Sequence, residues 1–372
     1  MAYNNEVHNA DFAPAYTRLV ERLNRFPQGA PPTKPLYDIL RVLFSEQEAA
    51  LVAQLPIQPF SAKDAARIWK IDESAARQVL EALASRALVV DTEKDDGQLL
   101  YTLPPPMAGF FEFSMMRVRD DVDQKLLAEL YHQYCTVEPD FLASLFGGET
   151  QMGRVFINEE VIPPGVAVFD YERATEVIKT ASPMGISLCY CRYKMQHLDQ
   201  NCYAPLDICM TFNGTAEGLI RHGFARQVDA AEGLDLLQQA YDHNLVQFGD
   251  NAREKVNFIC NCCGCCCEAL IAARRFETLQ PLHTTNFIAA IDTEACNGCG
   301  KCVNTCPVEA MTLVSANVPA HPKQKKARLI EELCLGCGVC ARVCGADGIT
   351  LQPRPERVFT PRTFAHRVVL AA

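Results

Sequence analysis

Apolar residues in the N-terminal part of the chain recur every three or four positions, the spacing of amphipathic helices. In the segment 1–33, an N-terminal arm, they predict one short helix that ends before the proline- and glycine-rich stretch 27–32. Ser61 is a typical helix cap and predicts a helix through Trp69, and a second helix is expected over 73–86. The predicted buried positions of the arm and of the second helix are Tyr16, Leu19, Val20, Leu23, Ala76, Val79, Leu80 and Leu83.

Two β-prone runs follow these helices. They predict strands over 87–90 and 99–103, joined by the turn-rich segment 92–97. The order helix, turn, helix and hairpin over 34–105 resembles a winged-helix domain, which implies either DNA binding through the second helix or packing against a partner. Packing is favoured, because an acidic hairpin would repel phosphate. The hairpin carboxylates are Asp91, Glu93, Asp95 and Asp96.

Three consecutive prolines at 104–106 mark the next boundary. Residues 106–153 are expected to form a helical connector, whose main helix covers 123–134. Cys135 stands alone in the sequence at the end of this helix, a position typical of a small buried apolar residue. The residues expected to be buried by the helix are Leu126, Leu127 and Leu130.

Helical and β-prone segments alternate over 154–284, which predicts an α/β domain. One helix is expected over 172–180, and a capping box at Asp229 and Glu232 opens another that extends to Asn244. Strands are expected over 185–188, 245–248 and 256–259.

Ten cysteines of this domain follow the predicted strand ends, where a layered domain usually presents a site. Because a thiolate-only set suits both iron–sulfur clusters and zinc, all ten are candidate metal ligands. Arg192 and Lys194 are expected to offset cluster charge or to be solvated. His197 is a candidate ligand or proton donor, with an exposed imidazole as the favoured interpretation. The ten are Cys189, Cys191, Cys202, Cys209, Cys260, Cys262, Cys263, Cys265, Cys266 and Cys267.

Three interpretations of the ten cysteines stay open. The first is a 4Fe–4S cluster on the four upstream cysteines with a further cluster on 260–267; the second is one unusual cluster with ligands from both groups. The third is zinc, or buried thiols alone. So many neighbouring thiols without a metal would oxidise, so the site is expected to be occupied, and an iron–sulfur centre is favoured over zinc. The segment Cys262-Cys263-Gly264 resembles the CCG feature of heterodisulfide-reductase-type subunits, which hold non-cubane clusters.

A duplicated cysteine motif dominates the C-terminal part. Cys296, Cys299, Cys302 and Cys306 recur thirty-eight residues later as Cys334, Cys337, Cys340 and Cys344. In the spacing C-x2-C-x2-C-x3-C, three thiolates converge on one cluster and the fourth points away. Glycines fill the gaps of each loop, as expected where the backbone turns close to a cluster.

Over 285–352 this motif resembles the bacterial two-cluster ferredoxin family. The resemblance implies two 4Fe–4S clusters, each with three ligands from one copy and the fourth from the other. Gly345 replaces the family's second proline, and the basic segment 321–328 lengthens the connection. A four-thiolate zinc site is disfavoured, because it uses two CxxC pairs rather than matched quartets. The implied sets are Cys296, Cys299, Cys302 and Cys344, and Cys334, Cys337, Cys340 and Cys306.

Composition narrows the range of functions. A net charge of −10 disfavours general nucleic-acid binding. Nineteen cysteines, an odd number at metal-like spacings, indicate a reducing cytoplasm rather than a disulfide scaffold. No signal-peptide pattern and no apolar window of about eighteen residues occurs, which argues against export and a membrane span. The arginine-rich tail 353–372 is, with Lys323, Lys325, Lys326 and Arg328, a candidate docking surface for an acidic redox partner.

Together these patterns predict an α+β multidomain, cytoplasmic iron–sulfur electron carrier from an anaerobe or another low-potential metabolism. It is expected to be a subunit or partner of a larger oxidoreductase and to relay electrons between its C-terminal clusters and the middle domain. Because no GxGxxG or P-loop pattern occurs, flavin, nicotinamide or ATP would come from a partner. The alternatives are a reductase with a catalytic cluster or thiol in the middle domain, and a redox-sensing winged-helix regulator.

Overall fold

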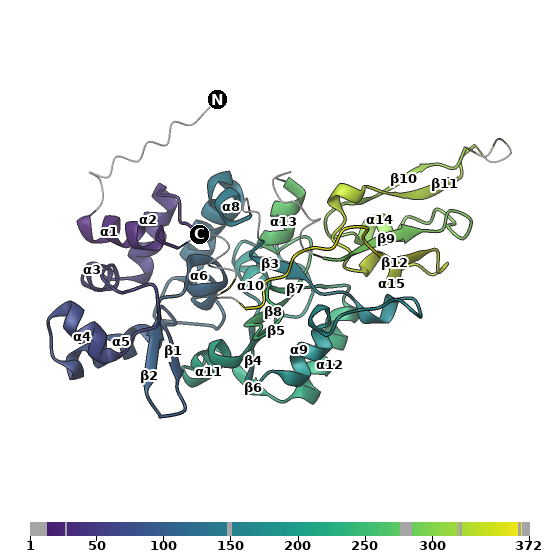
Figure 1. Cartoon of the computed structure of the whole chain (residues 1–372). Helices are drawn as coiled ribbons and strands as arrows, with labels where there is room; N and C mark the ends of the chain where they lie inside the picture. The colour runs from purple at the N-terminus through teal and green to yellow at the C-terminus, as the bar shows by residue number, and fades with distance from the viewer. Residues whose placement is uncertain are drawn as a thin grey trace.

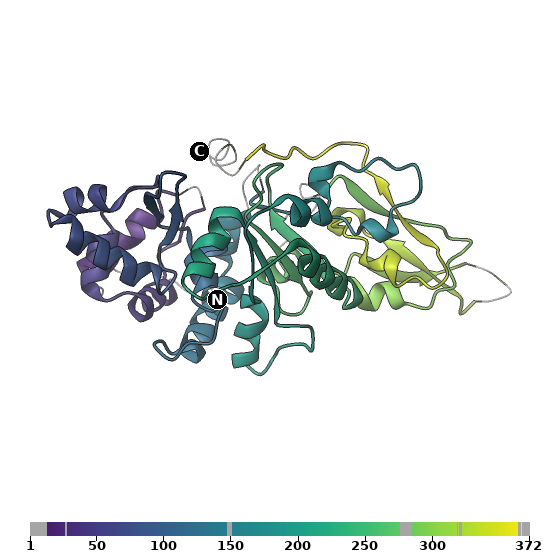
Figure 2. The ribbon, with the colours of Figure 1, turned by 90° about the horizontal axis from the view of Figure 1, so that it is seen from below.

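The computed structural model describes residues 13–26, 28–146, 151–275, 285–317, 319, 322–363 and 366. Three parts succeed one another along an elongated molecule (Figure 1). The N-terminal helices and the C-terminal cysteine-repeat domain lie at opposite ends, with a central sheet between them, and a view from below shows the same order (Figure 2). Within the described residues, no helix has the length and apolar character needed to cross a membrane.

The N-terminal part consists of five helices and a two-stranded hairpin. Ser61 caps α4 as predicted, since its side chain accepts from the Asp64 amide and the Asp64 carboxylate accepts from the Ser61 amide. The first strand begins three residues later than expected, at Val90, because the chain still turns after α5, where Ala87 has a positive φ of 56°. The elements are α1 (Pro14–Leu23), α2 (Lys34–Leu43), α3 (Glu46–Val52), α4 (Ala62–Trp69), α5 (Glu73–Ala84), β1 (Val90–Glu93) and β2 (Leu99–Thr102). Their order is the one expected of a winged helix, an assignment that stays a prediction.

Strand β1 of the acidic hairpin packs against α11 (Asn213–Arg221) of the middle domain and buries Asp91, whereas Glu93, Asp95 and Asp96 are exposed. The Arg221 guanidinium pairs with Asp91 and, at 3.2 Å, with Glu93. His222 Nε2 lies 3.0 Å from the Asp91 carboxylate. Burial raises the pKa of Asp91, but the hydrogen bonds from His222 and Arg221 outweigh it and leave the pKa below its ordinary value. The hairpin therefore serves a contact within the chain.

The connector contains η2 (Pro106–Phe110), α6 (Phe111–Phe113), α7 (Gln124–His132), η3 (Gln133–Val137) and α8 (Pro139–Phe146). The expected burial of Leu126 is wrong, since this side chain is 40% exposed. Helix α7 turns Leu127 and Tyr131 inward, because Tyr131 packs against Phe111, 4.9 Å between ring centroids. Cys135 is fully buried, as predicted.

A six-stranded sheet with the order β3-β7-β8-β5-β4-β6 forms the middle domain. Every pairing between these strands in the described residues is antiparallel, so the domain is an α+β layer and lacks the parallel strands expected of an α/β domain. Its strands are β3 (Gly153–Val155), β4 (Met184–Leu188), β5 (Asp207–Phe212), β6 (Arg226–Val228), β7 (Val246–Asp250) and β8 (Phe258–Cys262). Its other helical elements are η4 (Glu159–Val161), η5 (Asp170–Glu172), α9 (Ala174–Thr180), α10 (Tyr190–His197), α12 (Ala230–Asp242) and α13 (Glu268–Arg275).

Two cysteine segments that the sequence places in loops lie in regular structure. Strand β8 continues through Cys262, so Cys260 and Cys262 share one face of the sheet and Asn261 occupies the other. Asn261 donates to the Ile208 carbonyl and accepts from Gln247, which fixes this register. Helix α10 begins at Tyr190 directly after β4, so Cys191 stands in a first helical turn.

The C-terminal domain is a repeated unit with two pairs of antiparallel strands. Strand β9 (Phe287–Ile291) pairs with β12 (Ile349–Pro353), and β10 (Met311–Ser315) pairs with β11 (Lys325–Leu329), all antiparallel. Short helices α14 (Lys301–Thr305) and α15 (Val339–Arg342) lie within the two cysteine motifs, and η7 (Glu331–Leu333) directly precedes the second motif. The chain then runs back to the middle domain, where the Arg253 and Glu254 amides donate to the carbonyls of Pro361 and Arg362.

Candidate metal centres

Each of two small cavities in the C-terminal domain is lined by four cysteines. Both have a volume of about 20 Å³. One contains Cys296, Cys299, Cys302 and Cys344, and the other contains Cys306, Cys334, Cys337 and Cys340. The structure thus brings the cysteines together crosswise, in the two sets that the ferredoxin resemblance implies. That each set ligates one cluster stays a prediction.

Two equivalent glycines shape these cavities. Gly298 and Gly336 have φ values of 72° and 65°, in the left-handed region that disfavours other residues. A Cβ on Gly298 would lie 2.1 Å from the Lys325 carbonyl oxygen, and one on Gly336 would lie 2.1 Å from that of Phe287. No side chain fits at either position, so the loops pass close to the strand of the other half. The two cavities therefore have room for a compact inorganic group.

Backbone amides point at several of the cysteine sulfurs. The amides of Ala310, Ala327 and Gly336 donate to Sγ of Cys306, Cys296 and Cys334 at 3.2, 3.3 and 3.4 Å. Burial raises the pKa of Cys337 to about 12, so this thiol ionises only beside a compensating positive charge. Cluster iron supplies that charge, and the amides stabilise the resulting thiolates. The donor set therefore fits 4Fe–4S clusters.

The arginines of the tail bind within the chain. Arg354 donates to the Cys334 carbonyl at 2.6 Å, Arg357 lies over the Phe169 ring at 4.7 Å, and Arg362 pairs with Glu254 at 2.9 Å. Arg367 lies outside the described residues. Of the four basic residues of 321–328 in the predicted docking surface, Lys323, Lys325 and Arg328 are exposed, while Lys326 donates to the carbonyls of Thr293 and Cys296.

The ten cysteines of the middle domain divide into two groups. The four-thiol group comprises Cys202, Cys263, Cys265 and Cys266, whose sulfurs all lie within 4.8 Å of one another. Cys202 comes from the loop after α10, and the others come from the turn between β8 and α13. The structure thereby separates Cys202 from the upstream cysteines with which the first interpretation grouped it. The six-thiol wall comprises Cys189, Cys191, Cys209, Cys260, Cys262 and Cys267, which line one cavity together with Cys263 of the four-thiol group.

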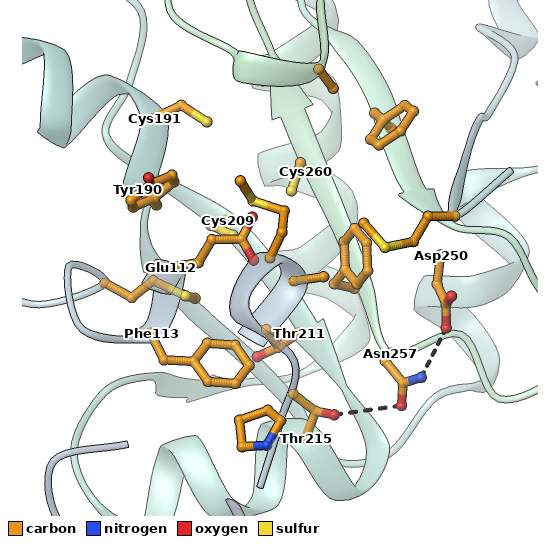
Figure 3. A pocket seen from close by; sticks show the side chains of 18 of the residues that line it. Glu112, Phe113, Tyr190, Cys191, Cys209, Thr211, Thr215, Asp250, Asn257 and Cys260 are labelled. Atoms are coloured by element: carbon orange, nitrogen blue, oxygen red, sulfur yellow. Dashed lines mark hydrogen bonds between the residues drawn. The ribbon is translucent and has the colours of Figure 1, made fainter. Parts of the chain in front are cut away.

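The six-thiol wall lines a single cavity of about 350 Å³ (Figure 3). Neighbouring thiols along it lie close enough to shift one another's pKa, in the order Cys209, Cys260, Cys262, Cys267 and Cys191. They come from β5, β8, α10 and the start of α13, so the sheet and two helices converge on this space. Such a set is a candidate for an iron–sulfur centre.

Glu112 is a further polar residue of this cavity that the sequence does not single out. It comes from α6 and points toward the same space as Cys209 and Cys260 (Figure 3). Burial, together with the negative charge of Glu268 and Cys267, raises the pKa of Glu112 to about 8. The carboxyl is therefore mostly protonated at neutral pH. An isolated acid inside the aromatic, apolar run 110–116 is the signal that the sequence offers.

The charged companions of the cysteines have distinct partners. Arg192 donates to the Pro205 and Asn261 carbonyls and lies 3.7 Å from Cys263 Sγ. Burial lowers the pKa of Arg192, but the charges of Cys189 and Cys263 outweigh it and raise this pKa, so the guanidinium stays charged beside these thiols. That Arg192 offsets cluster charge stays a prediction. Lys194 is buried against Glu268 rather than solvated. His197 is half-buried beside the Tyr193 ring and belongs to neither thiol group.

The cysteine run of the middle domain touches the C-terminal domain. A Cβ on Gly264 would lie 2.6 Å from the Pro307 carbonyl oxygen, so Gly264 packs directly on the residue after Cys306. The Asn158 amide donates to the Cys337 carbonyl at 3.3 Å. The second cysteine set therefore faces the middle domain, whereas Cys299 of the first set is exposed.

Comparison with known proteins assigns one part of the chain. Residues 289–351 match the family model of a 4Fe–4S dicluster domain. No curated protein matches the chain. The C-terminal unit is thus a 4Fe–4S dicluster domain, and the protein is an iron–sulfur protein, as the cysteine spacing predicts. The match does not extend into the middle and N-terminal domains.

Proposed function

We propose that this chain is an electron-transfer component of a larger, low-potential oxidoreductase. Two clusters in the dicluster domain and an iron–sulfur centre on the six-thiol wall would make up the relay. When bound, each cluster takes up and releases one electron. The observation that carries the proposal is the contact between Gly264 and Pro307, which joins the two cysteine-rich regions without intervening side chains.

The exposure of the first cysteine set suggests where a redox partner docks. Cys299 is exposed, and Lys325 and Arg328 are exposed on the neighbouring hairpin. Positive charge at the rim would attract an acidic partner and speed its association. The second set, turned toward the middle domain, would then pass electrons inward.

Iron analysis and redox titration test this proposal on anaerobically purified protein. Two cubanes contain about eight irons, so a middle-domain centre raises the total above about eight. An electron paramagnetic resonance titration should resolve more than two reducible centres. A total of about eight irons, with both signals belonging to the dicluster domain, would contradict a relay into the middle domain.

Replacing Gly264 with alanine should interrupt the contact between the domains. The new methyl group would meet the Pro307 backbone, and such overpacking costs about 1–3 kcal/mol of stability. Stopped-flow reduction should show a several-fold slower electron transfer into the middle domain, with unchanged spectra of the dicluster domain. Gly345→Ala is the matched control, because a Cβ there meets nothing within 4 Å. Equal rates in the two variants would show that the contact is not the path.

The 350 Å³ cavity favours a second candidate function, reduction of a small molecule inside the middle domain. Its volume lies in the range of about 300–1,000 Å³ typical of ligand sites. Apolar side chains such as Phe113 and Phe248 line most of it, and Asn257 forms a polar edge by hydrogen-bonding Asp250. A small, mainly apolar substrate fits this lining. Glu112 would supply one of the protons that a two-electron reduction consumes.

The protonated state of Glu112 has a measurable consequence for stability. In the unfolded chain the carboxyl ionises near its ordinary pKa of 4.5, whereas in the folded protein it keeps its proton up to about pH 8. The free energy of unfolding therefore falls as the pH rises through this window. Glu112→Gln has no carboxyl to titrate and lacks this pH-dependent loss. From low to high pH, the unfolding free energy of the variant should therefore rise relative to that of the native chain, by up to about 5 kcal/mol.

Urea unfolding under anaerobic conditions at about pH 6 and about pH 8.5 measures this gain. The difference in unfolding free energy between the variant and the native chain should grow with pH. A constant difference would mean that Glu112 is ionised throughout and has no proton to donate at neutral pH. We propose that the hairpin serves packing within the chain rather than DNA binding, since Asp91 is engaged with Arg221 and His222.

A further inference from the structure

The four-thiol group has sulfur separations that differ from those of the dicluster domain. Cys202 Sγ lies 3.6 Å from Cys263 Sγ and 4.0 Å from Cys266 Sγ, and the sulfurs of Cys265 and Cys266 are 3.6 Å apart. Of the described residues, this is the one group in which three or more potential ligand atoms lie within 4.8 Å of one another. The eight cysteines of the dicluster domain are described too, and none of their sets is so tight.

Such separations match a single metal ion. Four thiolates at about 2.3 Å from one ion occupy the corners of a tetrahedron whose edges are about 3.8 Å. In a cubane each thiolate binds a different iron. The four cysteine sulfurs therefore lie farther apart than they do around a single ion. The group is therefore too compact for a 4Fe–4S cluster and has the right size for one tetrahedral ion.

The surroundings supply charge compensation for that ion. Four thiolates around a divalent metal carry a net charge of −2. The Arg192 guanidinium, almost fully buried, donates to Cys263 Sγ at 3.7 Å and offsets part of this charge. Its remaining hydrogen bonds to the Pro205 and Asn261 carbonyls hold it in place. The site thus contains the buried positive charge of Arg192 as well as the four thiols.

The two chain segments of the group meet through these thiols and through Arg192, which donates to the Pro205 carbonyl beside one segment and to the Asn261 carbonyl beside the other. The side chain of Cys202 has the sulfurs of Cys263 and Cys266 as its hydrogen-bond partners, and its neighbour Tyr203 is fully exposed. A metal ion would fasten this loop to the turn that packs on Pro307. It would also leave the six-thiol wall as a separate ligand set.

We propose that Cys202, Cys263, Cys265 and Cys266 bind one tetrahedral metal ion, zinc(II) or iron(II), in place of a third cubane. The site does not depend on the electron-transfer role. With zinc it is a structural staple. With iron it is a one-electron site between the dicluster domain and the six-thiol wall.

Metal analysis of the anaerobically purified full chain tests the site. Cys202→Ser should lose one zinc or one iron per chain, while acid-labile sulfide stays unchanged. Cys209→Ser, from the six-thiol wall, should keep this ion. Cys135→Ala, which changes a buried cysteine outside both groups, should keep every metal. Loss of about four irons together with their sulfide in Cys202→Ser, or no loss of metal at all, would overturn the proposal.

A measurement on the native chain covers the case in which Cys202→Ser fails to fold. X-ray absorption at the zinc edge should show four sulfur neighbours at about 2.3 Å and no neighbouring metal. If the ion is iron, the oxidised protein should show the paramagnetic signal of a high-spin ferric tetrathiolate. The absence of both signatures from metal-replete protein would exclude a mononuclear site.

Discussion

Replacing Cys344 with alanine should abolish the cluster held by the first cysteine loop, although Cys344 belongs to the second motif. Its side chain lines the same cavity as Cys296, Cys299 and Cys302. The variant should lose about four irons per chain and the same paramagnetic signal as Cys299→Ala. Iron and sulfide analysis with low-temperature spectroscopy measures both effects.

The reciprocal variant makes the crosswise arrangement testable. Cys306→Ala should lose the signal that Cys337→Ala loses, since both side chains line the second cavity. Cys135→Ala controls for loss of a buried cysteine outside the cavities and should keep both signals. If Cys344→Ala instead matched Cys337→Ala, each motif would hold its own cluster and the crosswise assignment would be wrong.

Replacing Lys194 with methionine should cause the largest loss of stability outside the cysteines. Lys194 Nζ lies 2.6 Å from Glu268 Oε1, and the two side chains are 0% and 3% exposed. Burial lowers the pKa of Lys194, but Glu268 outweighs it, so the lysine stays charged. Without it the buried Glu268 is uncompensated, which costs about 3–5 kcal/mol. Urea unfolding measures the loss.

Two further variants separate charge from packing in that experiment. The double variant Lys194→Met with Glu268→Leu should recover part of the lost stability, because it leaves no unpaired buried charge. Lys34→Met breaks a surface pair whose lysine is 74% exposed, and it should cost no more than about 1 kcal/mol. If Lys194→Met cost as little as Lys34→Met, the buried pair would contribute nothing.

The local parts of the structure were predictable because their causes lie close together in the sequence. The dicluster loops are one example, since three ligands of each set fall within seven residues, as in 296–302. Helix α4 is another, because Ser61 and Asp64 cap it three residues apart. In both cases a fixed spacing is enough to determine the geometry.

The middle site was not predictable to the same depth, because its grouping depends on tertiary contacts. Cys202 meets Cys263 across sixty-one positions, brought there by the pairing of β5 with β8. The strand predicted over 256–259 ends too early, because β-propensity does not reveal that Cys260 and Cys262 continue β8. Glu112 reaches the cavity from a different domain of the chain, and only the fold brings it there.

The returning tail has a mechanical consequence. Arg354 donates a hydrogen bond to the carbonyl of Cys334. The segment beyond it accepts backbone hydrogen bonds from Arg253 and Glu254 of the middle domain. With this brace and the Gly264 contact on either side, the dicluster unit cannot swing as a tethered shuttle between remote docking points. If electrons pass to the middle domain as proposed, they should do so at fixed separation, with a rate that solvent viscosity leaves unchanged.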